Sequence, residues 1–310
     1  MLNRRQALKL FGVVSASPLV PLESHSAIRP GTNVSGFNYC LNMATLRGHK
    51  LGFIGELKTA SQAGFKMVEI WMDSLQQYLS TGGTLSEAKK QLDGLGMTAV
   101  NAIGFAKWIV DDEAERNKGI EQMKKEMGML AQIGCKRVAA PPMGATDKPG
   151  LDLKKAAERY RVILLAGDET GVVPHLELWG FSKNLNRLSE VMYVAIESGH
   201  PAARVLLDVY HLYKGGSGVE TLPLVGKTAV EIIHMNDYPA KEPSLITDAD
   251  RVHPGDGIAP VKRILNTLKS DDRPLIISEE VFNAGYYKQD ALQVAKTALN
   301  KMKHIVERVK

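Results

Sequence analysis

The chain has 310 residues, of which 44% are hydrophobic and 24% are charged, a composition typical of a globular protein with a large core. Its net charge is +5, but Arg4, Arg5 and Lys9 contribute much of that excess, and the chain beyond residue 27 carries only +3 without a lysine or arginine block. A nucleic-acid-binding face is therefore not supported. Cys40 and Cys135 are too few and too isolated for a disulfide framework or a zinc site, so we expect each to pack as a small apolar residue.

Residues 1–27 are predicted to be a twin-arginine export signal. Arg4 and Arg5 stand in the segment 3–9, and the weakly apolar segment 10–21 that follows is too short to span a bilayer. An ordinary basic helix start would show the same residues. If the leader interpretation is correct, the mature protein comprises residues 28–310 and is periplasmic. Otherwise it is cytoplasmic, and in neither case is stable membrane insertion expected.

Strand-length apolar runs alternate with helical periodicity through the first half of the chain. The sequence predicts strands at 35–41, 67–71, 97–103 and 136–140. A capping box at Thr84 to Glu87 opens one of the intervening helices, and Gly64 and Gly134 are predicted to end two others. Methionines at helical spacing in the segment 120–130 are interpreted as core residues.

The alternation continues through the second half of the chain. Four further strands are predicted, at 172–177, 204–208, within 231–237 and at 274–279. Helices are predicted at about 152–166, 185–195, 261–268 and 292–306, and a long loop at 238–257 is of the kind that covers a site. About eight β/α units without a linker predict a single α/β domain, a (β/α)8 TIM barrel over residues 28–310.

Four of the predicted strands end in residues that bind metals or move protons. These residues are Glu177, Asp208, His234 and Glu280. Each alone has a structural explanation: Glu177 as a salt-bridge partner, Asp208 as a cap of the following turn, and His234 as a buried core histidine. Because the carboxyl ends of barrel strands share one rim, the coincidence favours a common metal site. Three carboxylates and an imidazole suit Mn²⁺ best, with Mg²⁺, Co²⁺ or Zn²⁺ as further candidates.

The chain resembles the xylose isomerase-like barrel superfamily of sugar isomerases and epimerases, which includes ketose 3-epimerases, inosose dehydratases and, more distantly, endonuclease IV. The resemblance covers about residues 35–308. Its most specific segments are Leu207-Asp208-Val209-Tyr210-His211, His234-Met235-Asn236-Asp237, 250–257 and 278–283.

This resemblance implies roles for particular residues. It implies that Glu177, Asp208, His234 and Glu280 hold one divalent metal ion. It also implies that His211 and Arg251 bind substrate hydroxyls or a developing oxyanion. Glu279 is expected to point away from the site, because neighbouring residues on a strand face opposite ways.

The expected chemistry is removal of a proton from the carbon next to a carbonyl group, with the resulting enediolate stabilised by a metal. We expect Glu177 and Glu280 to act as base and acid on opposite faces of that carbon. A sugar isomerase or epimerase acting on a small keto-sugar or glycoside is therefore predicted. The sequence does not exclude a homo-oligomer.

Two alternatives use the same residues. A lyase or dehydratase acting on a keto-sugar or 3-keto-glycoside would expel a leaving group after the same proton removal. Export favours this alternative, because phosphorylated sugars are scarce outside the cytoplasm. A sugar-binding protein without catalysis would not need two glutamates beside one metal. Endonuclease activity is not supported, since additional histidines for a multinuclear cluster cannot be placed.

A histidine and three tryptophans are further candidates for substrate contact. His175 lies two residues before Glu177 and so on the same face of its strand. Support of the metal ligands or core packing would explain His175 as well. Trp71, Trp108 and Trp179 lie near the ends of predicted strands, where one or more of them would form a wall against a sugar ring or simply be buried.

Overall fold

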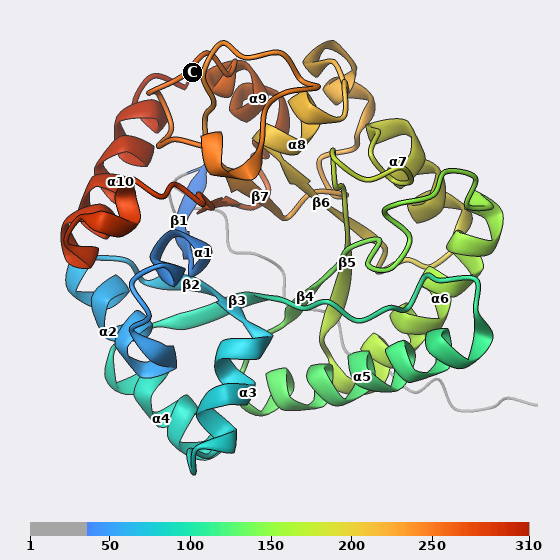
Figure 1. The fold of residues 1–310 in the computed structure, drawn as a ribbon, viewed down its shortest axis with the longest axis horizontal. Helices are drawn as coiled ribbons and strands as arrows, with labels where there is room; N and C mark the ends of the chain where they lie inside the picture. The colour runs from blue at the N-terminus through green and yellow to red at the C-terminus, as the bar shows by residue number, and fades with distance from the viewer. Residues whose placement is uncertain (1–35, 310) are drawn as a thin grey trace, which may run out of the picture. The chain divides into compact units, whose positions relative to one another are not determined.

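A computed structural model describes residues 36–309, in which eight parallel strands surround a common axis (Figure 1). The strands are β1 (Phe37–Asn42), β2 (Met67–Trp71), β3 (Thr98–Ile103), β4 (Arg137–Ala140), β5 (Val173–Glu177), β6 (Arg204–Asp208), β7 (Ile232–Met235) and β8 (Leu275–Glu279). Their order is β3-β2-β1-β8-β7-β6-β5-β4, and contacts between β3 and β4 nearly close the barrel. The predicted TIM barrel is confirmed, and the predicted export signal lies outside the described residues.

Most of the helices form a ring outside the strands, whereas the short α1 (Ala44–Arg47) lies beside the end of β1 (Figure 1). The other helices are α2 (Gly52–Ala63), α3 (Met72–Ser80), α4 (Leu85–Gly94), α5 (Glu113–Gln132), α6 (Leu153–Thr170), α7 (Leu188–Glu197), α8 (Val209–Lys214), α9 (Val261–Leu268) and α10 (Ala291–Val306). Short 3-10 helices lie at η1 (Val219–Leu224), η2 (Asp248–Asp250) and η3 (Tyr286–Lys288). Within residues 36–309, none of the helices has the length and apolar character that a membrane span requires.

Local signals in the sequence explain most helix boundaries. The Thr84 side chain accepts a hydrogen bond from the Glu87 amide, which confirms the capping box at the start of α4. Gly64 ends α2 with a φ of 100°. The helix predicted to end near residue 166 instead runs on to Thr170. A glycine is needed at position 167 inside α6, because the helix lies so close to the start of β5 that a Cβ there would be 2.7 Å from the Val172 carbonyl oxygen.

The core fills the space between strands and helices. Met123 and Met127 of α5 are fully buried, as are Cys40 and Cys135, so the predictions of a packing role for these residues are confirmed. Burial raises the pKa of the Cys135 thiol to about 12, which keeps it uncharged.

The loop between β7 and α9 returns to the barrel mouth. Asp237 and Val252 form an isolated antiparallel bridge. The Asp237 carboxylate also accepts hydrogen bonds from the backbone amides of Tyr238, Gly255 and Ala259. Both ends of the loop are thereby tied to one buried carboxylate, and this arrangement places Arg251 over the carboxyl ends of the strands.

Candidate active site

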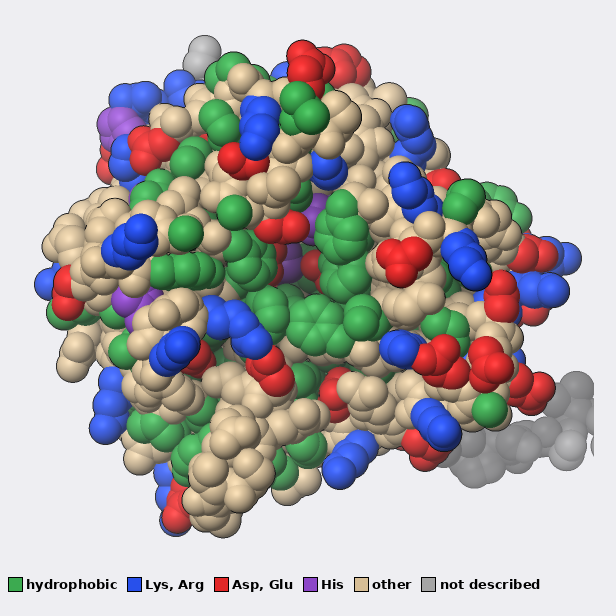
Figure 2. Space-filling view, viewed as in Figure 1, with side chains coloured by type: hydrophobic (Ala, Val, Ile, Leu, Met, Phe, Trp, Pro, Cys, Tyr) green, Lys and Arg blue, Asp and Glu red, His purple; other side chains and the backbone are tan. Residues whose placement is uncertain are grey.

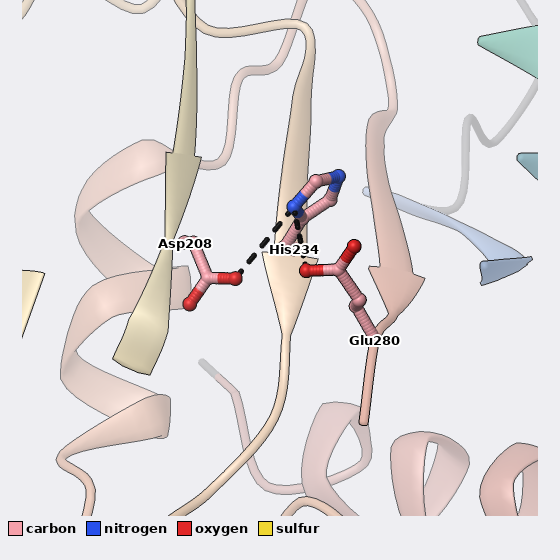
Figure 3. Close-up of side chains that lie close together, drawn as sticks. All are labelled: Asp208, His234 and Glu280. Carbon is pink, nitrogen blue, oxygen red and sulfur yellow. Dashed lines mark ion pairs between the residues drawn. The ribbon is translucent and has the colours of Figure 1, made fainter. Parts of the chain in front are cut away.

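The four residues predicted from strand ends meet at the carboxyl end of the barrel. Asp208 is paired with His234 in the register of β6 and β7, and the Glu280 amide bonds to the carbonyl oxygen of Met235. Parallel pairing therefore sets Asp208, His234 and Glu280 side by side (Figure 3). Glu177 ends β5, the next strand around the barrel.

The Nδ1 atom of His234 is the common neighbour of the three carboxylates. It lies 3.2 Å from Glu280 Oε2, 3.6 Å from Asp208 Oδ2 and 3.8 Å from Glu177 Oε1. All four side chains are buried. One ligand atom each from Asp208, His234 and Glu280 lies within 4.8 Å of the other two, which is a geometry that can hold a metal ion.

The unused hydrogen-bonding atoms of this cluster fit a divalent cation. His234 Nδ1 and Glu177 Oε2 are buried without a hydrogen-bond partner among the described residues. Buried polar atoms without partners are costly, and a cation would satisfy both. The donor set of carboxylate oxygens and one imidazole nitrogen suits Mn²⁺, Mg²⁺, Co²⁺ or Zn²⁺.

Asp208 uses its two oxygens differently. Oδ1 accepts hydrogen bonds from the His211 amide, at 3.0 Å, and from the Asn236 side chain, at 3.1 Å. The first of these bonds caps α8, so the structural alternative considered for Asp208 is real. Oδ2 faces His234 Nδ1 at 3.6 Å and accepts a hydrogen bond from Arg251, so the same carboxylate caps α8 and belongs to the cluster.

Glu69 is a member of the site that the sequence analysis did not assign. Its fully buried carboxylate lies with Oε1 3.0 Å from His234 Nε2. It also accepts hydrogen bonds from Asn42, at 3.0 Å, from Asn101, at 2.5 Å, and from Ser278, at 2.6 Å. An acidic residue inside the otherwise apolar strand 67–71 was the available signal. Its partners come from four different strands, which no local pattern could indicate.

Arg251 binds the same carboxylates from the loop above. Its Nη1 donates to Asp208 Oδ2, at 2.8 Å, and to Glu280 Oε2, at 2.7 Å. Its Nη2 donates to Asp248 Oδ1, at 2.6 Å, and lies 3.2 Å from His211 Nε2. The guanidinium is 1% exposed, so its charge is balanced almost entirely by these carboxylates. The predicted pair His211 and Arg251 is thus brought together beside the cluster.

Burial and neighbouring charges shift the pKa values of the cluster. Burial, with a contribution from the neighbouring Glu280, raises the pKa of Glu177 to about 8. Burial and the nearby Arg251 lower the pKa of His211 to about 4, so this imidazole is neutral near pH 7. Burial alone would lower the pKa of His234, but the surrounding carboxylates, Glu280 and Glu69 first, raise it well above its usual range.

A cavity of about 400 Å³ opens above these residues. Glu177, His211, Arg251 and Glu280 line its polar side. Its other walls are mainly aromatic and are formed by Trp71, Phe105, Trp179, Phe181 and Phe282. Figure 2 shows hydrophobic side chains gathered around a central hollow, with acidic and histidine side chains inside it. Trp71 lines this cavity and is also largely buried, and its contact with a sugar ring stays a prediction.

A comparison with protein families identifies the architecture of the chain. Residues 57–305 match the family model described as "Xylose isomerase-like TIM barrel". The chain belongs to this family. The resemblance inferred from its motifs is therefore confirmed.

Curated relatives of this xylose isomerase-like barrel include bacterial inosose isomerases. The protein of Halalkalibacterium halodurans is 27% identical over 278 residues, which cover 87% of this chain and 96% of the relative. The inosose isomerase of Bacillus subtilis is 26% identical over 269 residues, covering 83% and 94% of the two chains.

Solved structures of similar fold include a zinc-bound IOLI protein, with a TM-score of 0.79 and 23% identity. The aligned region covers 88% of this chain and 99% of the IOLI chain. An L-ribulose 3-epimerase has a TM-score of 0.69 and 15% identity, covering 88% of this chain and 95% of its own. These likenesses show the shared fold.

Two other residues that the sequence analysis considered in this xylose isomerase-like barrel do not line the cavity. His175 is fully buried in β5 but does not line the cavity, and neither of its ring nitrogens has a hydrogen-bond partner among the described residues. Burial lowers the pKa of His175 to about 3, so it is neutral, and its contact with substrate stays a prediction. Glu279 bonds to His253 Nδ1 at 2.5 Å and does not line the cavity, as expected for the glutamate that points away.

Proposed function

We propose that this protein is a divalent-metal-dependent sugar isomerase or epimerase that moves a proton at the carbon next to a carbonyl group. The observation that carries the proposal is the convergence of Glu177, Asp208 and Glu280 on His234 Nδ1 beneath a cavity of substrate size. The isomerase and epimerase class is also supported by the inosose isomerase relatives and the epimerase of similar fold.

Glu177, Asp208, His234 and Glu280 are the proposed ligands of the metal, and Mn²⁺ is the proposed ion. Mg²⁺, Co²⁺ and Zn²⁺ have compatible donor preferences, and a structure of similar fold has zinc bound. When bound, such an ion supplies positive charge that stabilises the oxygens of an enediolate. This stabilisation would make a proton next to a carbonyl acidic enough to remove.

Glu177 and Glu280 are proposed to move the proton. Both carboxylates line the cavity, and one is proposed to act as the base and the other as the acid on opposite faces of the sugar carbon. A pKa of Glu177 near 8 lets that carboxyl group hold a proton near neutral pH, although a bound cation would lower this value.

His211 and Arg251 are proposed to hold the substrate oxygens. Neutral His211 can donate or accept a hydrogen bond to a hydroxyl group. Arg251 remains charged, because its carboxylate neighbours raise its pKa even though burial opposes this. Its guanidinium is held in place by Asp248 and can stabilise a developing negative charge without reorganising.

A lyase acting on a keto-sugar or 3-keto-glycoside is the second candidate. It shares the removal of the proton next to the carbonyl group and then expels a neighbouring substituent. The shape of the cavity supports a lyase as well. The aromatic walls of the cavity extend from the cluster to the partly exposed Phe181, where a substituent of the keto-sugar could lie.

Deuterium uptake tests the proposal directly. The Mn²⁺-loaded protein is incubated in deuterated water with inosose, ketohexoses and 3-keto-glucosides, and the sugars are analysed by mass spectrometry and NMR. Solvent deuterium should appear at the carbon next to the carbonyl group of at least one sugar. A product of unchanged skeletal mass identifies an isomerase or epimerase, and loss of a fragment identifies a lyase. No uptake with any of these sugars contradicts both and favours a sugar-binding protein.

A further inference from the structure

The aromatic side chains of the cavity form a continuous wall. Ring centroids are 5.4 Å apart for Trp71 and Phe105, 6.2 Å for Phe105 and Trp179, and 5.1 Å for Trp179 and Phe181. Phe181 in turn lies 5.6 Å from the ring of His211. Aromatic neighbours at these distances pack against one another. The wall therefore extends from a strand end of the barrel to the residues proposed to bind substrate oxygens.

Exposure increases along this wall. Trp71 is 8% exposed, and its Nε1 donates to Asn42 Oδ1 at 2.9 Å, which fixes the indole beside the buried network of Glu69. Phe181, at the other end, is 43% exposed. The inner end is thus anchored in the barrel, whereas the outer end presents an apolar ring to solvent. An uncovered aromatic ring at the mouth of a cavity is suited to binding a ligand group.

The turn that carries the outer rings is held rigidly. Gly180 lies between Trp179 and Phe181, and a Cβ at this position would meet the His211 carbonyl oxygen at 2.3 Å and the Gly215 amide nitrogen at 2.7 Å. Only glycine allows this close approach of the turn to α8. Trp179 and Phe181 are consequently placed at a defined distance from His211, as a preformed binding surface requires.

The charges of the residues that line the cavity do not favour an anionic group at its outer end. Arg251 is the only Lys or Arg side chain among the described residues that line it. Its guanidinium already binds Asp208, Asp248 and Glu280. Among the described residues that line the outer end of the cavity, none offers a further cation for a phosphate or carboxylate of the ligand. The outer part of the ligand should be uncharged and flat or apolar on one face, as a sugar ring or an aryl group is.

We propose that Trp179 and Phe181 form an outer subsite that binds the second ring of a neutral keto-glycoside, while its keto-sugar ring lies at the carboxylate cluster. The proposal rests on the proposed function and adds the substrate class: glycosides of keto-sugars rather than free or phosphorylated monosaccharides. The second ring stacks on the aromatic faces, either as a sugar through its C–H face or as an aryl group through its π system.

Binding to a catalytically disabled protein tests this subsite. The Glu280→Gln variant is loaded with Mn²⁺, its metal content is verified by elemental analysis, and it is titrated calorimetrically with methyl 3-keto-glucoside, phenyl 3-keto-glucoside and a 3-keto-disaccharide. At least one of the two-ring ligands should bind about tenfold more tightly than the methyl glycoside, as expected for one additional stacking contact. Preference for the phenyl ligand alone would identify an aryl group as the second ring, and preference for the disaccharide alone would identify a sugar.

A second substitution tests whether Phe181 causes the tighter binding of the two-ring ligands. Adding Phe181→Ala should bring the affinity ratio of two-ring to methyl ligand close to one. Tyr193→Ala is the matched control, because Tyr193 is 42% exposed on α7 and does not line the cavity. This control should leave the ratio unchanged. Three outcomes would overturn the subsite. The Glu280→Gln variant could bind all ligands with equal affinity, the affinity ratio could stay unchanged after Phe181→Ala, or no ligand could bind.

The result also separates the subsite from the proposed chemistry. If the unsubstituted protein takes up no deuterium into any of these ligands but the affinity ratio depends on Phe181, the outer subsite is supported and the isomerase proposal is overturned. If deuterium is taken up but the ratio is one, the chemistry stands and the outer subsite is overturned.

Discussion

His234 Nε2 lies 3.0 Å from Glu69 Oε1 inside the barrel, although the two residues are 165 positions apart in the chain. With Nε2–H donating to this carboxylate, Nδ1 is the nitrogen that faces Glu177, Asp208 and Glu280. Glu69 itself is held by donors from Asn42, Asn101 and Ser278. A carboxylate that orients a ligand histidine in this way also increases its basicity.

Substitution of Glu69 by Gln is expected to weaken metal binding. The amide would present a donor to a pocket that contains only donors, so His234 would lose its orienting acceptor. We expect Mn²⁺ affinity to fall about 10- to 100-fold in a chelator-competition assay. Glu279→Gln is a matched control, because Glu279 is also a buried carboxylate bonded to a histidine, but that histidine, His253, is not a proposed metal ligand. Equal losses in the two variants would show that Glu69 has no specific effect on the metal.

Substitution of Glu280 by Gln is expected to abolish proton exchange while the fold survives. The amide cannot take up a proton from the substrate, and the loss of a positioned acid or base costs about 10²- to 10⁴-fold in rate. Deuterium uptake measures the chemistry, and circular dichroism checks the fold. Turnover within a few-fold of the unsubstituted protein would contradict the role assigned to Glu280.

Metal removal is expected to stop turnover and lower thermal stability together. Ligands that bind only the folded state add stability, and an ion at a concentration 100 times its Kd adds about 2.7 kcal/mol. Dialysis against a chelator should therefore lower the melting temperature, and Mn²⁺ should restore it. The His234→Asn variant should show no such rise on addition of Mn²⁺. An equal rise in this variant would place the bound ion elsewhere.

Acid stability is expected to depend on Glu231, at the opposite end of β7 from the cluster. Burial alone would raise the pKa of this carboxylate, but Arg137 and Arg204, which donate to it at 2.8 and 3.0 Å, lower the value to about 2. Because the pKa in the folded state is depressed, the stabilisation is present above about pH 4.5 and is lost as the pH falls toward 2.

Urea unfolding across this pH range checks the effect. Glu231→Gln should cost on the order of 2–3 kcal/mol at neutral pH and progressively less toward pH 2. Glu220→Gln is the control, because Glu220 forms an ion pair with Arg263 in which both side chains are more than half exposed. Its cost should stay below about 1 kcal/mol. A cost for Glu231→Gln that is independent of pH would refute the linkage.

Export is expected to require both arginines near the N-terminus. Replacing Arg4 and Arg5 by lysine keeps the positive charge but removes the guanidinium pair that defines a twin-arginine signal. The protein should then remain in the cytoplasm when cell fractions are compared by immunoblotting. Unchanged export of the double variant would reject the proposed signal and the periplasmic location.

Local patterns in the chain were sufficient to predict the barrel. Apolar runs of strand length, each followed by a helical pattern, identified eight β/α units, and the residues that end the later strands identified Glu177, Asp208, His234 and Glu280. These signals are local because a strand buried on both faces needs a continuous apolar run, and a side chain at its carboxyl end follows that run directly.

Only the tertiary structure decided how those residues are oriented and which others join them. Closing the sheet brings together side chains from strands distant in the chain, so Asn42, Glu69 and Ser278 meet although no periodicity relates them. The same closure leaves His175 buried away from the cavity, and the loop after β7 places Arg251 on the carboxylates. Sequence patterns report which face of an element is buried, but long-range contacts depend on the register and closure of the whole barrel.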